Sequence, residues 1–338
     1  MPLPSREPTP PFDITRASHV VLDVQDLAAS RRFYEELIGL VVTEADDDVI
    51  FLRGVEEACH HSLVLRRAAE GACNRIGFRV RREADLDAAA TWFEQRGLPA
   101  EFVDVPFQGK TTLHTTDAAG AQLELVARME TVPRRIMAFD TFKGAAPARF
   151  DHYQLHVADV AKATGMYAGL GFRISEYISL DATPGTPLIA SFNARKGNAN
   201  DIVLVANEGP RLHHFSYVIH DAPNTMLRLG DLASALGYSI DYGPSRHGLG
   251  YETFLYLRDP DGHRIELLSH PYQFIDEEEE PFGWAADDGR AVNLYGPPPS
   301  LGWYNEATTF TGVETVMPDM NLAEKMGPGN RRMRGSHR

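Results

Sequence analysis

An α+β protein of four β-α-β-β-β modules, arranged as two tandem barrel-like domains, is expected from this sequence. Two observations lead to this expectation. A strand-and-helix pattern near residue 18 recurs near residue 151, and each copy is followed by a second unit of the same kind. The Gly-, Ala- and Pro-containing segment 143–148 separates the copies. Because one such module is an open, curved sheet, two have to pair before a cavity closes.

The first module of each copy covers residues 18–40 and 151–172. Both segments begin with the alternating pattern of a strand and then reach an Asp that can cap a helix. Both helices carry a Tyr at the same depth. The matched pairs are Asp26 with Asp159 and Tyr34 with Tyr167.

The second module of each copy repeats a strand, a helix and a strand pair with a Gly turn. These elements are expected at 74–80, 85–96 and 115–126, and again at 212–218, 225–236 and 259–268. We therefore divide the chain into a disordered arm (1–14), an N-terminal domain without metal (15–143), a C-terminal catalytic metal-binding domain (149–272), and a wrap or lid segment with a loose tail (273–338).

Overlaying the two copies isolates a polar set. His152 falls on His19, Glu266 falls on Glu124, and His214 falls on Ile76. Two imidazoles and a carboxylate on separate strands suit a divalent iron or manganese ion held on one face, with the other face open. Since the N-terminal copy lacks one imidazole, we expect metal only in the C-terminal copy.

Composition excludes several classes of protein. The net charge of −14 argues against nucleic acid as a partner. No apolar run approaches the ~20 residues that span a bilayer, so no membrane partner is expected. Two cysteines, Cys59 and Cys73, make no disulfide framework, and no secretory signal is visible at the N-terminus. We expect a cytoplasmic protein.

Four segments of the C-terminal copy carry a family resemblance. They are Arg149-Phe-Asp-His-Tyr153, Gly209-Pro-Arg-Leu-His-His-Phe215, Gly243-Pro-Ser-Arg-His-Gly248 and Tyr256-Leu-Arg-Asp-Pro-Asp-Gly-His-Arg-Ile-Glu266. Together they resemble the type I extradiol ring-cleaving dioxygenases of the vicinal oxygen chelate superfamily, which has a glyoxalase-like fold. The pattern is most similar to that of homoprotocatechuate and catechol 2,3-dioxygenases.

The resemblance implies an enzyme that inserts both atoms of O2 into a catechol-type ring at a mononuclear metal. His152, His214 and Glu266 would be the ligands of Fe(II), with Mn(II) as the alternative, and O2 would be the co-substrate. His247 and Tyr256 would donate to the metal-bound catecholate oxygens. A homo-oligomer, dimer or tetramer, is also implied.

Several positions depart from the family pattern. The family's acid/base His matches Asn200, which can hydrogen-bond but cannot shuttle a proton. A family Asn matches Gln154, and a pocket Trp matches Phe192. Two Arg residues that bind a substrate carboxylate match Tyr242 and Val292, which argues against a carboxylate at that place.

Other residues have ordinary interpretations. Arg246 or Arg290 could replace the missing cations. His213 should point to the opposite strand face from His214, and His263, in an Asp-Gly turn, should be exposed. The cluster Cys59-His60-His61 should not converge on a metal, because consecutive residues alternate faces. Two other functions stay open: a metal-dependent isomerase or lyase of the same superfamily, and a non-catalytic aromatic-binding protein.

Overall fold

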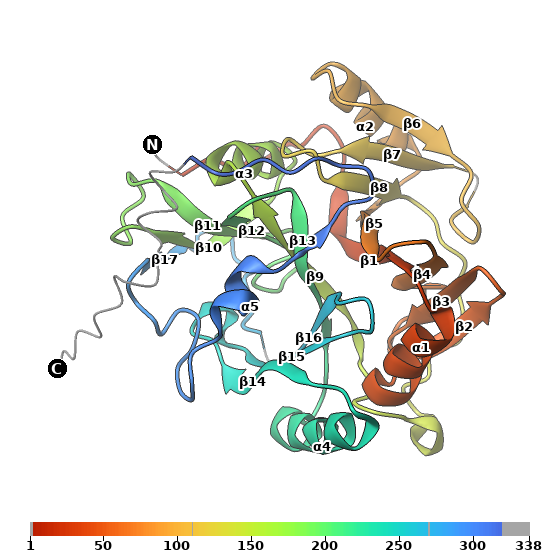
Figure 1. Ribbon diagram of the computed structural model, residues 1–338. Helices are drawn as coiled ribbons and strands as arrows, with labels where there is room; N and C mark the ends of the chain where they lie inside the picture. The colour runs from red at the N-terminus through yellow and green to blue at the C-terminus, as the bar shows by residue number, and fades with distance from the viewer. Residues whose placement is uncertain (1–2, 110, 270, 320–338) are drawn as a thin grey trace.

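The computed structural model describes residues 3–109, 111–269 and 271–319. Two domains lie side by side, an N-terminal one (red to yellow) and a C-terminal one (green to cyan; Figure 1). Each consists of two β-α-β-β-β modules, which confirms the predicted α+β fold.

Four modules follow one another along the chain, each with its helix after its first strand. The first comprises β1 (Ile14–Val24), α1 (Leu27–Arg31) continued by the π-helical η1 (Arg32–Ile38), β2 (Val41–Ala45), β3 (Val49–Arg53) and β4 (Leu63–Arg67). The second comprises β5 (Ala72–Val80), α2 (Ala84–Glu94), β6 (Ala100–Val103), β7 (Thr112–Thr116) and β8 (Gln122–Val126). The third comprises β9 (Arg149–Val157), α3 (Val160–Gly169), β10 (Arg173–Ser179), β11 (Leu188–Ala194) and β12 (Ile202–Ala206). The fourth comprises β13 (Arg211–Val218), α4 (Ala222–Leu236), β14 (Ile240–Arg246), β15 (Thr253–Arg258) and β16 (Arg264–Ser269), with the short 3₁₀ turn η3 (Leu249–Tyr251).

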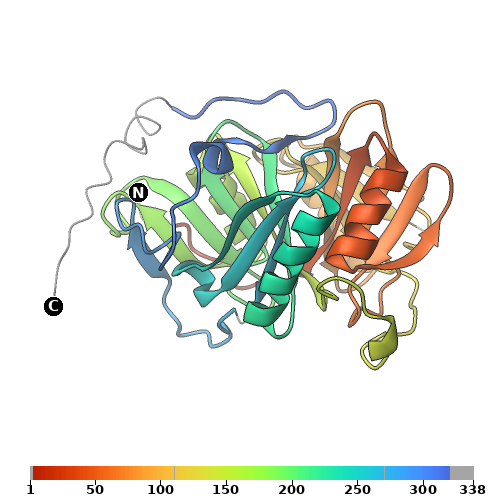
Figure 2. The same ribbon diagram turned by 60° about the horizontal axis from the view of Figure 1, so that its bottom comes forward.

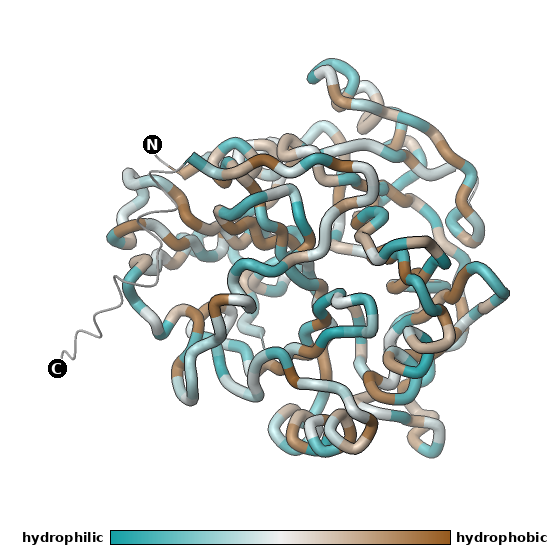
Figure 3. Tube along the Cα trace, in the orientation of Figure 1, coloured by the Kyte–Doolittle hydropathy of each residue, from teal (hydrophilic) through white to brown (hydrophobic). Residues whose placement is uncertain are grey.

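Both domains join their modules in the same way. The N-terminal sheet has the order β2-β3-β4-β1-β5-β8-β7-β6, and the C-terminal sheet has the order β14-β15-β16-β13-β9-β12-β11-β10-β17. The central pairs β1–β5 and β9–β13 are antiparallel and hold the first strand of each module. Hydrophobic residues gather along these strands, while many turns are hydrophilic (Figure 3). The helices cover the outside of the sheets, and α4 lies beside the helix α1–η1 of the other domain (Figure 2).

The predicted helix caps and matched tyrosines are present. Asp26 Oδ1 accepts from Ala28 N and Ala29 N, at 2.9 and 3.0 Å. Asp159 Oδ1 accepts from Lys162 N at 2.9 Å. Such caps satisfy backbone N–H groups that have no partner inside the helix.

Each matched Tyr also ties one domain to the other. Tyr34 donates to Asp259 Oδ2 at 2.9 Å, and Tyr167 donates to Asp117 Oδ2 at 3.0 Å. The two acceptors occupy equivalent positions, in the Gly turns before β16 and β8. The duplication therefore supplies a reciprocal pair of contacts between the domains.

The N-terminal arm is packed where we expected disorder. Arg6 Nε donates to Gly171 O at 3.0 Å, and Glu7 N donates to Ala168 O at 2.9 Å. Phe12 is buried against Trp92. Apolar burial and backbone hydrogen bonds offset the conformational entropy that residues 3–13 lose on ordering. The Pro-rich composition of this segment gave no sign of these contacts.

The segment after β16 returns across the C-terminal domain. β17 (Phe282–Ala285) extends the sheet beside β10, and β18 (Thr308–Thr309) pairs with β13. Between them, the short helix α5 (Leu301–Asn305) buries Trp303. The loose tail predicted from about Pro318 falls mostly on residues 320–338, outside the described residues. No helix among the described residues is long and apolar enough to cross a bilayer.

Candidate metal centre

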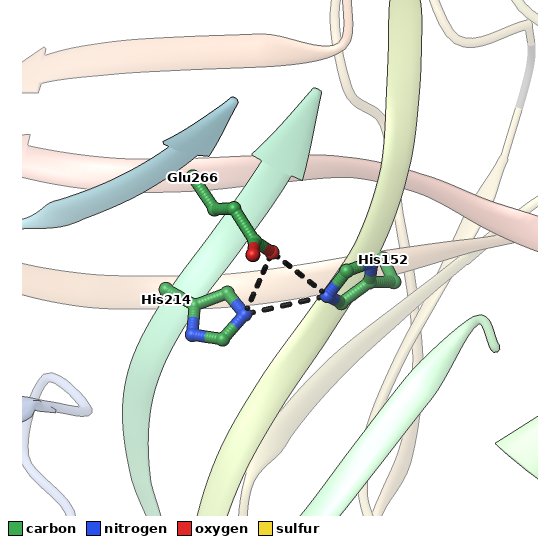
Figure 4. Close-up of side chains that lie close together, drawn as sticks. All are labelled: His152, His214 and Glu266. Atoms are coloured by element: carbon green, nitrogen blue, oxygen red, sulfur yellow. Dashed lines mark hydrogen bonds and ion pairs between the residues drawn. The ribbon is translucent and has the colours of Figure 1, made fainter. Parts of the chain in front are cut away.

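Three side chains from adjacent strands converge inside the C-terminal domain. His152 lies on β9, His214 on β13 and Glu266 on β16, which are neighbours in the sheet. All three are buried and face one another (Figure 4). In the part of the chain that the structure describes, one ligand atom from each of these three side chains lies close enough to the other two for all three to bind a single ion.

The spacing of the ligand atoms fits an ion held on one face. His152 Nε2 and His214 Nε2 are 3.3 Å apart. Each is 3.2 Å from Glu266 Oε2. Ligands about 2.1 Å from a metal and at right angles to each other are about 3.0 Å apart. Because all three separations are near that value, the set fits one triangular face of an octahedron.

A chain of hydrogen bonds fixes the orientation of His214. His213 Nε2 lies 2.7 Å from Trp303 O, which can only accept, so His213 Nε2 carries a proton. Burial lowers the pKa of His213 well below its usual value, so the ring is neutral and its Nδ1 is an acceptor. His214 Nδ1 therefore donates to His213 Nδ1 at 2.7 Å. Burial also lowers the pKa of His214 to about 4, which leaves its Nε2 lone pair directed at the site.

Asp151 orients His152 in the same manner. His152 Nδ1 donates to Asp151 Oδ2 at 2.9 Å, so Nε2 faces Glu266. Burial alone would lower the pKa of His152, but the hydrogen bonds to Asp151 and Glu266 outweigh it and raise the pKa to about 10. Burial would also raise the pKa of Glu266, but the histidines hold it well below its usual value. The site therefore keeps a carboxylate that attracts a positive charge.

The Glu266 carboxylate is only partly satisfied by protein groups. Ser216 Oγ donates to Oε2, while Oε1 is buried without a hydrogen-bond partner among the described residues. An unpartnered buried carboxylate oxygen is costly unless a ligand completes it. This orphan oxygen supports a cation at the cluster.

His247 and Tyr256 form a linked pair beside the cluster. His247 Nδ1 donates to Val292 O, and Tyr256 OH lies 3.0 Å from His247 Nε2. His247 Nε2 is 3.7 Å from Glu266 Oε1. Burial, together with the Glu266 charge, raises the pKa of the Tyr256 hydroxyl well above 10, so the hydroxyl keeps its proton. Two groups that can hydrogen-bond a ligand oxygen thus stand on one side of the site.

Residues 16–125 and 149–267 match the family model described as the Glyoxalase/Bleomycin resistance protein/Dioxygenase superfamily. The protein belongs to this superfamily. Each match covers one two-module domain, in agreement with the internal duplication.

Similar proteins of known activity match nearly the whole chain. A manganese-dependent 2,3-dihydroxybiphenyl 1,2-dioxygenase from Geobacillus genomosp. 3 is 27% identical, over 88% of this chain and 98% of its own. A metapyrocatechase from Geobacillus stearothermophilus is 26% identical, over 91% and 98%. Among solved structures, the homoprotocatechuate 2,3-dioxygenase of Arthrobacter globiformis is 33% identical, with a TM-score of 0.85 over 89% of this chain and 94% of that one.

Three residues that depart from the family pattern lie in the third module. Asn200 is 3% exposed, and its Oδ1 has no hydrogen-bond partner among the described residues. Gln154 follows His152 by two residues on β9 and so shares its strand face. Phe192 is buried with Leu249 and Ala291. Asn200 and Phe192 are thus buried side chains of the catalytic domain's third module, and Gln154 shares a strand face with His152.

Tyr242 and Val292, which stand at the positions of the two expected Arg residues, belong to one aromatic cluster. Tyr242 packs with Tyr256 and Trp303, and Val292 packs against this group. Arg246 instead stacks over the ring of Tyr251, with its guanidinium carbon 3.8 Å from the centroid.

Arg290 is likewise engaged elsewhere, because its guanidinium is exposed and paired with Asp288, at 2.6 Å. Neither Arg290 nor Arg246 is directed to the cluster.

The N-terminal counterpart of His214 is Arg75, and our sequence overlay on Ile76 was wrong. Ser216 pairs with Glu266, and the equivalent pair in the other domain is Gly77 with Glu124. Counting two residues back from each gives His214 and Arg75. Arg75 Nε accordingly lies 3.8 Å from Glu124 Oε2, whereas Ile76 is buried in the core. A one-residue shift exchanges the two strand faces.

His263 was judged differently by sequence and structure. His263 is 1% exposed, not exposed as we predicted, because its Nε2 bonds Asp23 O of the other domain at 3.0 Å. His60 stacks on Phe107 with ring centroids 3.9 Å apart, and His61 Nε2 bonds Gln108.

Sequence reasoning missed several residues that build the site. Asp151 and Ser216 each bond a candidate ligand. The signal for Asp151 was its place directly before His152. Ser216 could have been found from strand parity, since it follows His214 by two residues.

Proposed function

We propose that this protein is an extradiol ring-cleaving dioxygenase that opens a catechol-type ring beside the diol, using O2 and a mononuclear Fe(II) or Mn(II). The observation that carries the proposal is the facial cluster of His152, His214 and Glu266 with an orphan carboxylate oxygen. Relatives named as metapyrocatechase and as a manganese-dependent dioxygenase support the reaction class.

His152 Nε2, His214 Nε2 and Glu266 would hold the metal on one face. Such a metal would bind the diol and O2 and would allow electron density to pass from the ring to oxygen. The protein's part is to direct both Nε2 atoms at the metal. Asp151 and His213 do this by accepting hydrogen bonds from Nδ1 of His152 and Nδ1 of His214.

His247 and Tyr256 act on the oxygens of the diol. A catechol binding to a metal has to lose protons, and the Tyr256–His247 pair can accept or donate at these oxygens. Val292 O fixes the His247 ring, so Nε2 faces Tyr256 OH and the cluster. The burial of both side chains excludes water, which strengthens their hydrogen bonds.

Asn200, Gln154 and Phe192 would contact the substrate or oxygen. The Asn200 amide can donate to a bound oxygen but cannot deliver a proton. Tyr242 would face the ring substituent, and Arg246 would remain outside because it is engaged with Tyr251. The isomerase and aromatic-binding alternatives gain no specific support from these contacts.

The test is a turnover experiment on the metal-loaded protein. The protein is loaded anaerobically with Fe(II) or, separately, Mn(II), and then mixed with catechol and air-saturated buffer. We expect a yellow ring-opened product and one O2 consumed per catechol. With ¹⁸O2, both labelled atoms should enter the product. Binding of catechol without O2 consumption would support a non-catalytic protein and contradict the proposal.

The duplication offers a matched control. Glu266→Gln removes a candidate ligand, while Glu124→Gln makes the same chemical change at the equivalent strand position of the other domain. The first should abolish O2 consumption, and the second should retain it.

We also propose a homo-oligomeric, cytoplasmic enzyme. The two free cysteines, Cys59 and Cys73, support the cytoplasmic location, because thiols stay reduced in that compartment. Light scattering of the purified protein would test the oligomeric state.

A further inference from the structure

A lysine in the loop between β11 and β12 is not used by the proposed function. Lys196 lies in this loop, four residues before Asn200. Its side chain is 19% exposed, so most of it is removed from water. Because a charged ammonium group is costly to bury without partners, its charge has to be met by protein oxygens.

The Lys196 ammonium group donates to oxygens of three buried residues. Its Nζ lies 2.6 Å from Asp151 O, 2.7 Å from Asn200 O and 3.0 Å from Asp201 Oδ1. Asp151, Asn200 and Asp201 are 1%, 3% and 0% exposed. An ammonium group has three N–H donors, and these bonds use all of them. Lys196 therefore ties the main chains of Asp151 and Asn200 to one point.

Asp201 holds the lysine in place and also joins the two domains. Its Oδ1 accepts from Ala17 N of β1, at 2.7 Å, in addition to Lys196 Nζ. Its Oδ2 accepts from Arg195 N and Lys196 N, at 2.7 and 3.0 Å. The loop is thus anchored where it begins, and the N-terminal domain contributes to the anchor. The ammonium group of Lys196 therefore has a fixed place.

One acceptor of Lys196 directly precedes a candidate metal ligand. Asp151 Oδ2 accepts from His152 Nδ1 at 2.9 Å. Asp151 Oδ1 accepts from Asn198 Nδ2 at 2.7 Å and lies 3.8 Å from Lys196 Nζ. No other Lys or Arg among the described residues forms an ion pair with Asp151. The loop that contains Lys196 therefore sets the position of the carboxylate that orients the His152 ring.

The other main-chain acceptor belongs to the residue that stands where the family has its acid/base His. Asn200 Oδ1 has no hydrogen-bond partner among the described residues. The main chain around it is held instead, because Lys196 bonds Asn200 O and Ser175 Oγ donates to Ala199 O. The place of the Asn200 amide is therefore decided by its main chain, and Lys196 helps to fix that main chain.

We propose that Lys196 is a positioning residue of the metal centre, which holds the His152 side of the ligand set and the Asn200 amide at a fixed separation. This inference rests on the proposed function for the contact of Asn200 with oxygen. Lys196 acts through Asp151 and Asn200 and touches no substrate. Without this tether, the metal should bind more weakly and the steps that involve oxygen should slow. Binding of the diol should change little, because its other contacts come from the fourth module.

The first test measures metal binding without turnover. Lys196→Met keeps the length of the side chain and removes its charge and its donors. Titration of the metal-free protein with Mn(II), with the free ion followed by EPR, gives Kd. We expect Kd to rise about 10–100-fold, the range typical of groups that orient metal ligands. Lys162→Met, at an exposed position of α3 in the same module, should leave Kd unchanged.

The EPR spectrum of bound Mn(II) and a second variant separate positioning from general stability. At saturating Mn(II), the spectrum of Lys196→Met should differ from that of the wild type, because the line shape depends on ligand geometry. Lys196→Arg keeps the charge, but its planar guanidinium cannot direct three donors at the same oxygens. It should change Kd and the spectrum in the same direction to a smaller degree, and it carries the test if Lys196→Met does not fold. A lower melting temperature with wild-type Kd and spectrum would make Lys196 a structural residue and overturn the proposal.

Turnover at saturating metal separates this inference from the proposed function. With Fe(II), Lys196→Met should lower kcat for catechol by about tenfold or more and leave KM for catechol nearly unchanged. A wild-type kcat would overturn the proposal, since Asn200 would then be placed without Lys196. If no catechol is cleaved but Mn(II) Kd and spectrum change in Lys196→Met and not in Lys162→Met, the reaction is wrong and the positioning role stands. If catechol is cleaved and Lys196→Met keeps wild-type values throughout, the reaction stands and the Lys196 proposal fails.

Discussion

The two domains have the same topology but leave different groups unsatisfied at equivalent positions. In the N-terminal domain, Glu124 Oε1 bonds His19 Nε2 at 2.7 Å and Oε2 bonds His114 Nε2 at 2.9 Å. In the C-terminal domain, Glu266 Oε1 has no hydrogen-bond partner among the described residues. The same carboxylate on the same strand is closed by protein groups in one domain and open in the other.

The equivalent positions also differ in charge and size. Arg75 brings a permanent cation where His214 offers a lone pair, and a cation repels a metal ion. Gly77 replaces Ser216, and a Cβ at Gly77 would meet the His19 ring at 2.2 Å. The His19 ring therefore closes over the space that a side chain fills in the other domain. Ligand types alone do not define a metal site; an unsatisfied, correctly spaced set does.

The largest difference between the domains should appear on removing ligands. His214→Ala or Glu266→Ala should abolish stoichiometric metal binding and turnover, because two ligands remain. His19→Ala or Glu124→Ala should leave metal content near one ion per chain. Elemental analysis and O2 uptake of the four variants measure this. Equal metal loss from both domains would contradict a single site.

Asn200 belongs to the open domain and lacks the proton that a His could deliver. Asn200→His should accelerate the steps after oxygen binding with simple catechols, within the ~10²–10⁴-fold range of general acid–base assistance. Mixing the anaerobic enzyme–catechol complex rapidly with O2 resolves these steps. If the variant slows every step with every substrate, Asn200 is a positioning residue that a His cannot replace.

Substrate substituents test how the open domain recognises charge. With Tyr242 and Val292 in place of two Arg residues, catechols bearing neutral or apolar substituents should exceed homoprotocatechuate in kcat/KM. Each missing charge-assisted hydrogen bond corresponds to about 1.5–3 kcal/mol. A substrate panel measures the order. A clear preference for homoprotocatechuate would mean that Arg246 or Arg290 moves to bind the carboxylate.

Substitution at neighbouring positions tests the corrected equivalence of Arg75 with His214. Ile76→His places an imidazole in the core and should reduce the free energy of unfolding by about 2–3 kcal/mol. Arg75→His, on the face of Glu124, should cost less than about 1 kcal/mol, because the Arg75–Glu124 contact is long, at 3.8 Å, and Glu124 keeps its bonds to His19 and His114. Urea denaturation compares them. Equal losses would contradict the assigned strand face.

The smallest expected effect concerns the closed N-terminal cluster and pH. Burial would raise the pKa of Glu124, but His114 and His19 hold it well below its ordinary value of 4.5. The ionised Glu124 therefore stabilises the fold above pH 4.5, and this contribution is lost as pH falls below 4.5 toward the folded-state pKa. Glu124→Gln should cost about 1–2 kcal/mol at pH 7. The difference in free energy of unfolding between Glu124→Gln and the wild type should become smaller as pH falls below 4.5. A difference that grows in acid would contradict a lowered pKa of Glu124.

The sequence by itself determined the four modules, the helix caps and the identity of the polar set. The sequence shows local patterns directly, because they involve residues that are close along the chain. Examples are the alternating strands, the Asp residues before helices (Asp26 and Asp159) and the matched Tyr residues. The duplication then singled out His152 and Glu266 because both copies place them on first and last strands. These features needed no knowledge of strand register.

Tertiary structure decided the features that depend on register and on distant partners. The register of β5 against β8 pairs Gly77 with Glu124, so the side chain on the face of Glu124 is that of Arg75 and not that of Ile76. Trp303, 89 residues after His214 in the chain, sets the tautomer of that ligand through His213. Burial of His263 by the other domain also arises between segments far apart in sequence. A strand slip of one residue reverses every side chain, and the sequence does not record such a slip.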